Sequence, residues 1–134
     1  MMHVSTSTFL RWVLVADAAT CMVAGLLMVF GSTLLAQFSG LPAGLLRYAG
    51  ISLVPFAAFL VYVASRDSLS PSRVWTVILL NALWTADSFL LFATGWVTPT
   101  ELGYAFVSAQ ALAVAMFAAL EYVGLKKSTA ASII

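Results

Sequence analysis

Four long apolar segments constrain the fold of this chain more than any other feature of its sequence. Each is about 20 residues long, the length of helix that crosses a hydrocarbon core of roughly 30 Å. Hydrophobic residues make up 63% of the 134 residues and charged residues only 8%, whereas about a quarter of a soluble domain is charged. We therefore expect a single all-α domain over 1–134, an integral membrane four-helix bundle. Its predicted helices cover 9–30, 46–65, 73–96 and 101–124.

The stretches between these segments are rich in glycine, proline and serine, which end helices and form turns. Short connections favour antiparallel neighbours and predict an up-down-up-down topology. The longest connection, residues 31–46, carries an apolar stripe with helical spacing at Leu34, Leu35, Phe38 and Leu41. This stripe is compatible with a short helix in the membrane interface and equally with extra turns of the first membrane helix.

The two halves of the sequence share a pattern. Asp17 is followed eight residues later by Gly25, and Asp87 is followed eight residues later by Gly95. Such a repeat indicates two helical hairpins in tandem. Chance similarity between apolar helices is the alternative, and the sequence leaves both interpretations open.

The basic residues predict the orientation of the bundle. Five of the six lie on one side of the predicted membrane, and only Arg47 lies on the other. Because Lys and Arg concentrate in cytoplasmic loops, we expect both termini in the cytoplasm. The five are Arg11, Arg66, Arg73, Lys126 and Lys127.

Composition also excludes several kinds of chemistry. The net charge of +1 gives no basic excess for nucleic acid. A single cysteine, Cys21, and a single histidine, His3, supply neither a disulfide nor a metal cluster nor a pair of haem ligands. We find no set of nucleophile, base and acid and no phosphate-binding glycine loop. The prediction is a protein that is not an enzyme and that uses no metal or cofactor.

Charged side chains inside the membrane are the most informative residues, because each is costly unless it is paired or hydrated. Arg47 and Asp87 are expected in the same half of the membrane, opposite the termini. We predict a bidentate ion pair between them that locks the second helix against the third. The alternative is a conditional pair that a substrate or a proton breaks.

Two further acids lie in the predicted spans. Asp17 lies about 9 Å past Arg11 along its helix, at a different depth from Asp87, so we expect no close pair of carboxylates. With no nearby cation guaranteed, Asp17 is our candidate proton site. Glu121 is five residues before Lys126 and is expected to extend to the cytoplasmic interface rather than to carry a proton.

Uncharged polar residues form stripes on the last two predicted helices. The third helix carries Asn81 and Thr85 with Trp84 beside them, and the fourth carries Gln110 and Glu121 on nearly the same face. These side chains form a candidate ligand site along a small-molecule path. Hydrogen bonding between helices explains them equally well.

Five short motifs carry a resemblance to known proteins. They are Gly40-Leu41-Pro42, Leu45-Leu46-Arg47-Tyr48-Ala49-Gly50, Pro55-Phe56-Ala57-Ala58, Asn81-Ala82-Leu83-Trp84 and Ala109-Gln110-Ala111-Leu112-Ala113. Over nearly the whole chain, the sequence resembles small four-helix inner-membrane proteins of bacteria to which no activity is assigned. The resemblance implies a four-helix fold in a bacterial cytoplasmic membrane. In size and in its first-helix carboxylate, the chain is also similar to the small multidrug resistance transporters, in which an embedded acid exchanges protons for cationic drugs; this similarity implies that role for Asp17.

Three functional hypotheses follow. The first is an accessory subunit that self-associates or docks on a larger membrane complex through faces of small residues, which permit close helix approach. The second is a small proton-coupled carrier or channel that uses Asp17. The third is a lipid or quinone binding protein, which requires an apolar cleft open to the bilayer. The small residues are Ala16, Thr20, Ala24, Ala105, Ala109 and Ala113.

Overall fold

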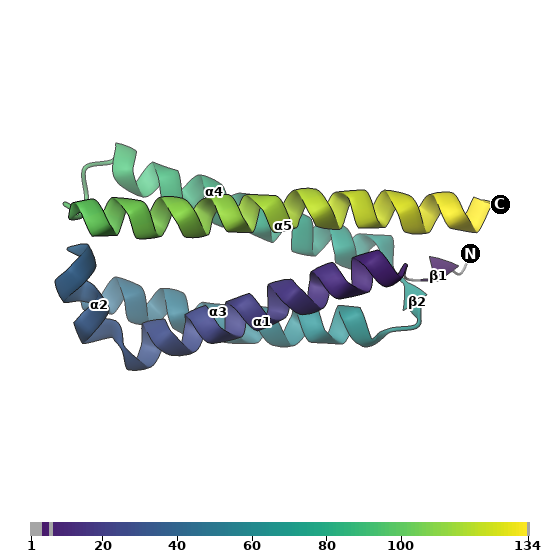
Figure 1. The fold of residues 1–134 in the computed structure, drawn as a ribbon, viewed down its shortest axis with the longest axis horizontal. Coiled ribbons are helices and arrows are strands. Elements are labelled where there is room, and N and C mark those ends of the chain that lie inside the picture. The colour runs from purple at the N-terminus through teal and green to yellow at the C-terminus, as the bar shows by residue number, and fades with distance from the viewer. Residues whose placement is uncertain (1–3, 6, 134) are drawn as a thin grey trace.

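The computed structural model describes the backbone of residues 4–5 and 7–133 and the side chains of residues 7–68 and 70–128. Four long helices and one short helix make up nearly all of it (Figure 1). The four long helices are long and apolar enough to cross a membrane, which confirms an all-α, multi-pass membrane bundle. The elements are β1 (Val4–Ser5), α1 (Thr8–Phe30), α2 (Ser32–Ser39), α3 (Ala43–Ser65), β2 (Ser68–Leu69), α4 (Pro71–Ala93) and α5 (Glu101–Ile133).

Some helix ends differ from the predicted ones. α4 begins at Pro71, because proline suits the first turn of a helix, where its missing N–H costs nothing. It ends three residues before the predicted boundary, and Gly95 beyond it has a φ of 68°. α5 continues to Ile133 instead of ending near 124, since no glycine or proline follows Gly124.

The connection after α1 contains a separate helix, α2, and not an extension of α1. Gly31 ends α1, with its N–H bonded to the carbonyl of Leu27. Gly40 ends α2 in a left-handed conformation with a φ of 73°, a common helix terminator. The N–H of Thr100 then donates to the carbonyl of Ser39 at 2.9 Å, which ties the end of α2 to the start of α5.

The long helices pack as two antiparallel hairpins, α1 with α3 and α4 with α5, and both termini lie at one end (Figure 1). Gly25 and Gly50 face each other in the first hairpin, where a Cβ on Gly50 would lie 2.7 Å from the carbonyl oxygen of Gly25. Glycine therefore allows the two backbones to touch. This arrangement agrees with the predicted tandem hairpins.

The two hairpins meet at the end that carries the termini, separate beyond it, and are joined again at the far end, where α2 contacts α5. Near the termini, a Cβ added to Gly124 of α5 would lie 2.9 Å from the Cβ of Leu10 of α1. Every buried residue of α4 lies between Val74 and Asn81, and no later side chain of this fully described helix is buried. We call the part with the termini, up to the level of Asn81, the closed half and the remainder the open half.

Candidate functional site

A cluster of buried polar side chains lies at the boundary between the two halves. Asp17 of α1, Asn81 of α4 and Glu121 of α5 are each at most 2% exposed. The Nδ2 of Asn81 donates to Oδ2 of Asp17 at 2.8 Å and to Oε1 of Glu121 at 2.7 Å. The thiol of Cys21 donates to Oδ1 of Asp17 at 3.4 Å. These four residues join three helices, and we call them the carboxyl clamp.

Two predictions about these acids are wrong. Glu121 does not extend to the membrane interface, because it is 0% exposed and bonded to Asn81. Asp17 has a close acidic neighbour after all, since both carboxyl groups accept from one nitrogen and their oxygens lie within two hydrogen-bond lengths. The close approach of α5 to α1 at Gly124 brings Glu121 to the level of Asp17.

The clamp holds two acids and no base. Within the described side chains, neither Asp17 nor Glu121 forms an ion pair, and Arg11 instead lies 4.0 Å from Asp67 outside the spans. The Oε2 atom of Glu121 is buried with no hydrogen-bond partner among the described atoms. The two carboxyl groups thus meet in a buried site without a compensating positive charge among the described side chains, which is energetically costly in a membrane.

Adjoining cavities occupy the open half, between the hairpins. One of 240 Å³ reaches the clamp at Cys21 and Asn81, and one of 330 Å³ extends from it toward the start of α3. Both are lined by Leu53, Trp84 and Asp87. A third cavity of 560 Å³ lies on the side of α1 and α2 and adjoins the second one. It shares Ala24, Met28 and Phe106 with that cavity. We call these neighbouring, largely apolar cavities together the inter-hairpin cleft.

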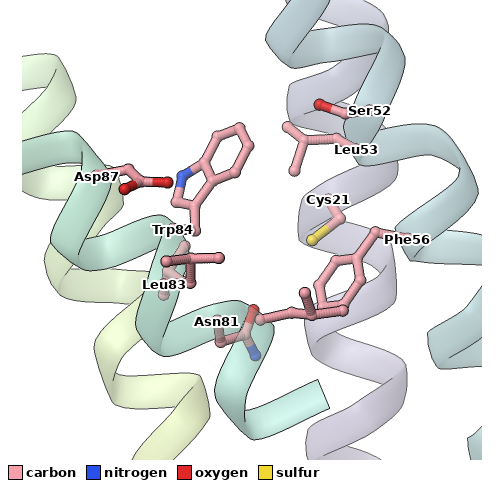
Figure 2. Close-up of a pocket in the computed structure, with 10 residues that line it drawn as sticks. Cys21, Ser52, Leu53, Phe56, Asn81, Leu83, Trp84 and Asp87 are labelled. Atoms are coloured by element: carbon pink, nitrogen blue, oxygen red, sulfur yellow. The ribbon is translucent and has the colours of Figure 1, made fainter. Parts of the chain in front are cut away.

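The α4 wall of the cleft carries an aromatic ring and a carboxylate. Figure 2 shows Trp84 and Asp87 on α4, across from Leu53 on α3. The Nε1 of Trp84 donates to Oε1 of Gln110 at 2.7 Å, and Nε2 of Gln110 donates to the hydroxyl of Ser88 at 3.0 Å. These bonds fix the indole in the wall. Asp87 is exposed to the cleft, and none of the described residues bonds to its carboxylate.

The predicted ion pair between Arg47 and Asp87 is wrong. The Nη2 of Arg47 donates to the hydroxyl of Ser32 at 3.3 Å, and among the described side chains no ion pair joins it to Asp87. The two residues lie at similar depth, but α3 and α4 diverge in the open half. Equal depth therefore does not bring the side chains together.

The other predicted site residues were expected either to line a ligand site or to form hydrogen bonds between helices, and the structure contains both cases. Asn81, Trp84 and Gln110 line the cleft. The hydroxyl of Thr85 instead donates to the backbone carbonyls of Asn81 at 3.0 Å and Ala111 at 3.3 Å. Thr85 therefore serves hydrogen bonding within and between helices and does not line the described cavities.

The predicted site did not include Cys21, although its spacing from Asp17 indicates that the two side chains share a face of the helix. Cys21 follows Asp17 by four residues, one helical turn, which places both on one face of α1. Among the side chains that the structure describes, no three His, Cys, Asp or Glu residues are placed to hold a metal ion. The arrangement offers an apolar cleft with one acid on its wall and a buried pair of acids beneath it. Comparisons with protein families, curated proteins and solved structures gave no match to this chain.

Proposed function

We propose that this membrane protein binds a lipophilic cation in the inter-hairpin cleft. The observation that carries the proposal is the carboxylate of Asp87 on an apolar wall, beside the indole of Trp84. An acid in the apolar part of a membrane is costly unless a positive charge or water accompanies it. A cation with apolar substituents complements the carboxylate and the apolar walls together, and an indole ring adds a favourable cation–π contact.

The size and position of the cleft support the same ligand class. Two of its cavities, of 330 and 560 Å³, have volumes within the range of about 300–1,000 Å³ typical of small-molecule sites, and the third, of 240 Å³, is slightly smaller. Beyond Asn81, α4 packs against α5 but has no buried side chain, so the seam between α3 and α4 offers a lateral entrance from the bilayer. With cytoplasmic termini in a bacterial inner membrane, this entrance lies in the half of the membrane away from the cytoplasm.

This geometry bears differently on each of the three functional hypotheses drawn from the sequence. The accessory-subunit hypothesis rests on faces of small residues, and the Arg47–Asp87 pair that was expected to hold the bundle together is absent from the described side chains, which leaves Asp87 available to a ligand. A neutral quinone or lipid matches the apolar walls but leaves the carboxylate without a counter-charge. A carrier that uses Asp17 remains compatible, since Asp17 lies in the clamp below the cleft.

The test is equilibrium binding of tetraphenylphosphonium to the purified protein in lipid nanodiscs. Tetraphenylborate, which has the same shape and the opposite charge, is the matched ligand. We expect the cation to bind more tightly than the anion. The substitution Asp87→Asn should raise the Kd of the cation about tenfold or more, since each 1.4 kcal/mol lost is roughly a factor of ten.

Glu101→Gln is the matched control, because Glu101 is an exposed acid at the start of α5 and its loss changes the net charge equally. It should leave the Kd of the cation unchanged. Equal binding of cation and anion, or equal effects of Asp87→Asn and Glu101→Gln, would contradict a carboxylate-based cation site. Absence of cation binding would also overturn the proposal and favour the accessory-subunit hypothesis.

A further inference from the structure

The carboxyl clamp contains the last buried residue of α4 and the last described hydrogen bond from α4 to the opposite hairpin. Asn81 is the final buried residue of α4, and Asp17 on the other hairpin accepts from it at 2.8 Å. Its Nδ2 group donates one hydrogen bond to each of the two acids. Beyond this layer α4 forms the wall of the cleft. The state of the clamp therefore bears directly on the position of that wall.

The basic residues of the chain are engaged elsewhere. Arg47 bonds to Ser32 in the open half, and the others contact groups at the end with the termini. From α3, every buried residue is apolar. The titratable groups that face one another in the clamp are thus the acids and the Cys21 thiol, with the neutral Asn81 between them. The contacts at the closed end are Arg11 with Arg66 and Asp67, Arg66 and Arg73 with Tyr62, Lys126 with Tyr122 and Lys127 with Phe9.

A single proton resolves the electrostatic conflict in this cluster. With both acids ionised, two negative charges face one amide without a cation, and the buried Oε2 of Glu121 lacks a hydrogen-bond donor. With one acid protonated, its O–H can donate to the other carboxylate while Asn81 still donates to both. The protonated pair therefore suits a buried, closed clamp without a cation, and the doubly ionised pair does not.

We propose that Asp17 and Glu121 share a proton, that this proton keeps α4 clamped at Asn81, and that its loss releases α4 and widens the inter-hairpin cleft. The sign follows from the charges. Raising the pH removes the proton, the two carboxylates repel each other, and one must move toward water. The inference goes beyond cation binding and needs no ligand, so its test stands even if tetraphenylphosphonium does not bind.

The shared proton is measurable by infrared spectroscopy. A protonated carboxylic acid has a C=O stretch that ionised carboxylates lack and that shifts in D₂O. At neutral pH we expect this band in the native protein and its loss in both Glu121→Gln and Asp17→Asn, since either change removes one half of the pair. Absence of the band, or its persistence in both variants, would overturn the shared proton.

The movement of α4 is measurable between spin labels on opposite walls of the cleft. Ser52 of α3 and Leu83 of α4 line the same cavity and are both exposed. A Ser52→Cys and Leu83→Cys pair would be labelled in a Cys21→Ser background, where a hydroxyl replaces the thiol as donor to Asp17. We expect the distance to increase on raising the pH by about 1–2 Å or more, the size of helix shifts in other switching proteins.

Two variants distinguish a clamp that opens when it loses its proton from a cluster with only a structural role. Glu121→Gln keeps the shape and replaces the acid by a neutral amide that can donate to Asp17, so it should hold the short distance at every pH. Asn81→Leu removes the bridging donor and should give the long distance at every pH. Glu101→Gln, an acid of α5 far from the clamp, should keep the native pH response. A distance that ignores pH in the parent protein, or that still responds to pH in Glu121→Gln, would refute the switch.

Discussion

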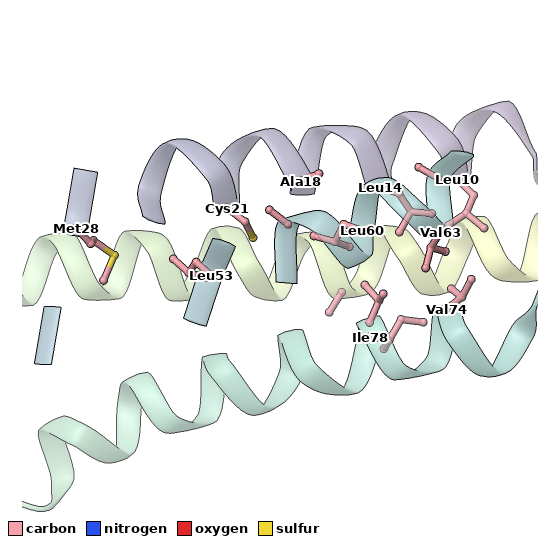
Figure 3. Close-up of a cluster of buried hydrophobic side chains, with 14 of the residues drawn as sticks. Leu10, Leu14, Ala18, Cys21, Met28, Leu53, Leu60, Val63, Val74 and Ile78 are labelled. Carbon is pink, nitrogen blue, oxygen red and sulfur yellow. The ribbon is translucent and has the colours of Figure 1, made fainter. Parts of the chain in front are cut away.

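The closed and open halves are built from the same four apolar helices, yet they pack differently. In the closed half, Leu10, Leu14 and Leu60 of the first hairpin are 0% exposed and belong to one core cluster with Val74 and Ile78 of α4 (Figure 3). In the open half no side chain of α4 is buried, and a cleft separates α4 from the first hairpin. In lipid, apolar side chains gain little by leaving the solvent for each other. Shape complementarity and polar bonds, rather than hydropathy, therefore decide which half closes.

The residues that close each contact are small or polar. Gly124 allows α5 to approach Leu10 of α1, and Asn81 bridges Asp17 and Glu121 at the limit of the closed half. Beyond this limit, no described hydrogen bond joins α4 to the opposite hairpin, and the cavities of the cleft lie there instead.

The largest expected effect is on the stability of the closed half. Leu60→Ala should lower the free energy of unfolding by about 2–5 kcal/mol, because the cavity it leaves in a fully buried site cannot collapse completely. Leu90→Ala, in the open half, should change it by less than about 0.5 kcal/mol, as at other exposed sites. Reversible unfolding in mixed micelles or bicelles measures both. Equal losses would show that the open half is packed in the membrane as tightly as the closed half.

A smaller effect is expected at the outer end of the open half, where α2 meets α5. A Cβ on Gly103 would clash with the backbone carbonyl oxygen of Ser39. Gly103→Ala should cost about 1–3 kcal/mol of stability, the usual penalty of overpacking. Gly44→Ala is the control, because a Cβ there meets nothing within 4 Å and alanine favours a helix. If both variants unfold alike, the contact between α2 and α5 contributes nothing to the open half.

The sequence predicts the spans well and the contacts between them poorly. A run of about 20 apolar residues defines a membrane helix without reference to its neighbours, and all four predicted helices are present within a few residues apart from the extension of α5 to Ile133. The sequence left open whether residues 31–46 extend α1 or form a separate helix, and the structure shows that α1 ends at Gly31 and α2 follows it. The spans themselves are predictable because their apolar length does not depend on packing.

The prediction of the site failed wherever it depended on the relative position of two helices. Depth along each helix placed Arg47 near Asp87, but it carries no information on the divergence of α3 from α4. Glu121 lies near Lys126 in sequence, which suggested an interfacial position, whereas its partner Asn81 is 40 residues away. Nothing in the sequence specifies that α5 touches α1 at Gly124. Pairings across a bundle are set by these contacts and not by spacing.

The smallest expected effect is the coupling between Arg47 and Asp87. Because Arg47 bonds to Ser32 and Asp87 faces the cleft, their effects on stability should be independent. The double variant Arg47→Ala with Asp87→Ala should therefore equal the sum of the two single variants within about 0.3–0.5 kcal/mol. Unfolding of the four proteins in one bicelle composition completes the cycle.

The same cycle also tests whether the open half ever closes. A coupling energy of about 0.5–3 kcal/mol would be typical of residues in contact, and it would mean that α3 and α4 come together with Arg47 on Asp87 in a populated state. Repeating the cycle with tetraphenylphosphonium present distinguishes the sources of such a coupling. A cation that occupies Asp87 competes with Arg47 and lowers the coupling, whereas an unchanged value would place the pair outside the ligand site.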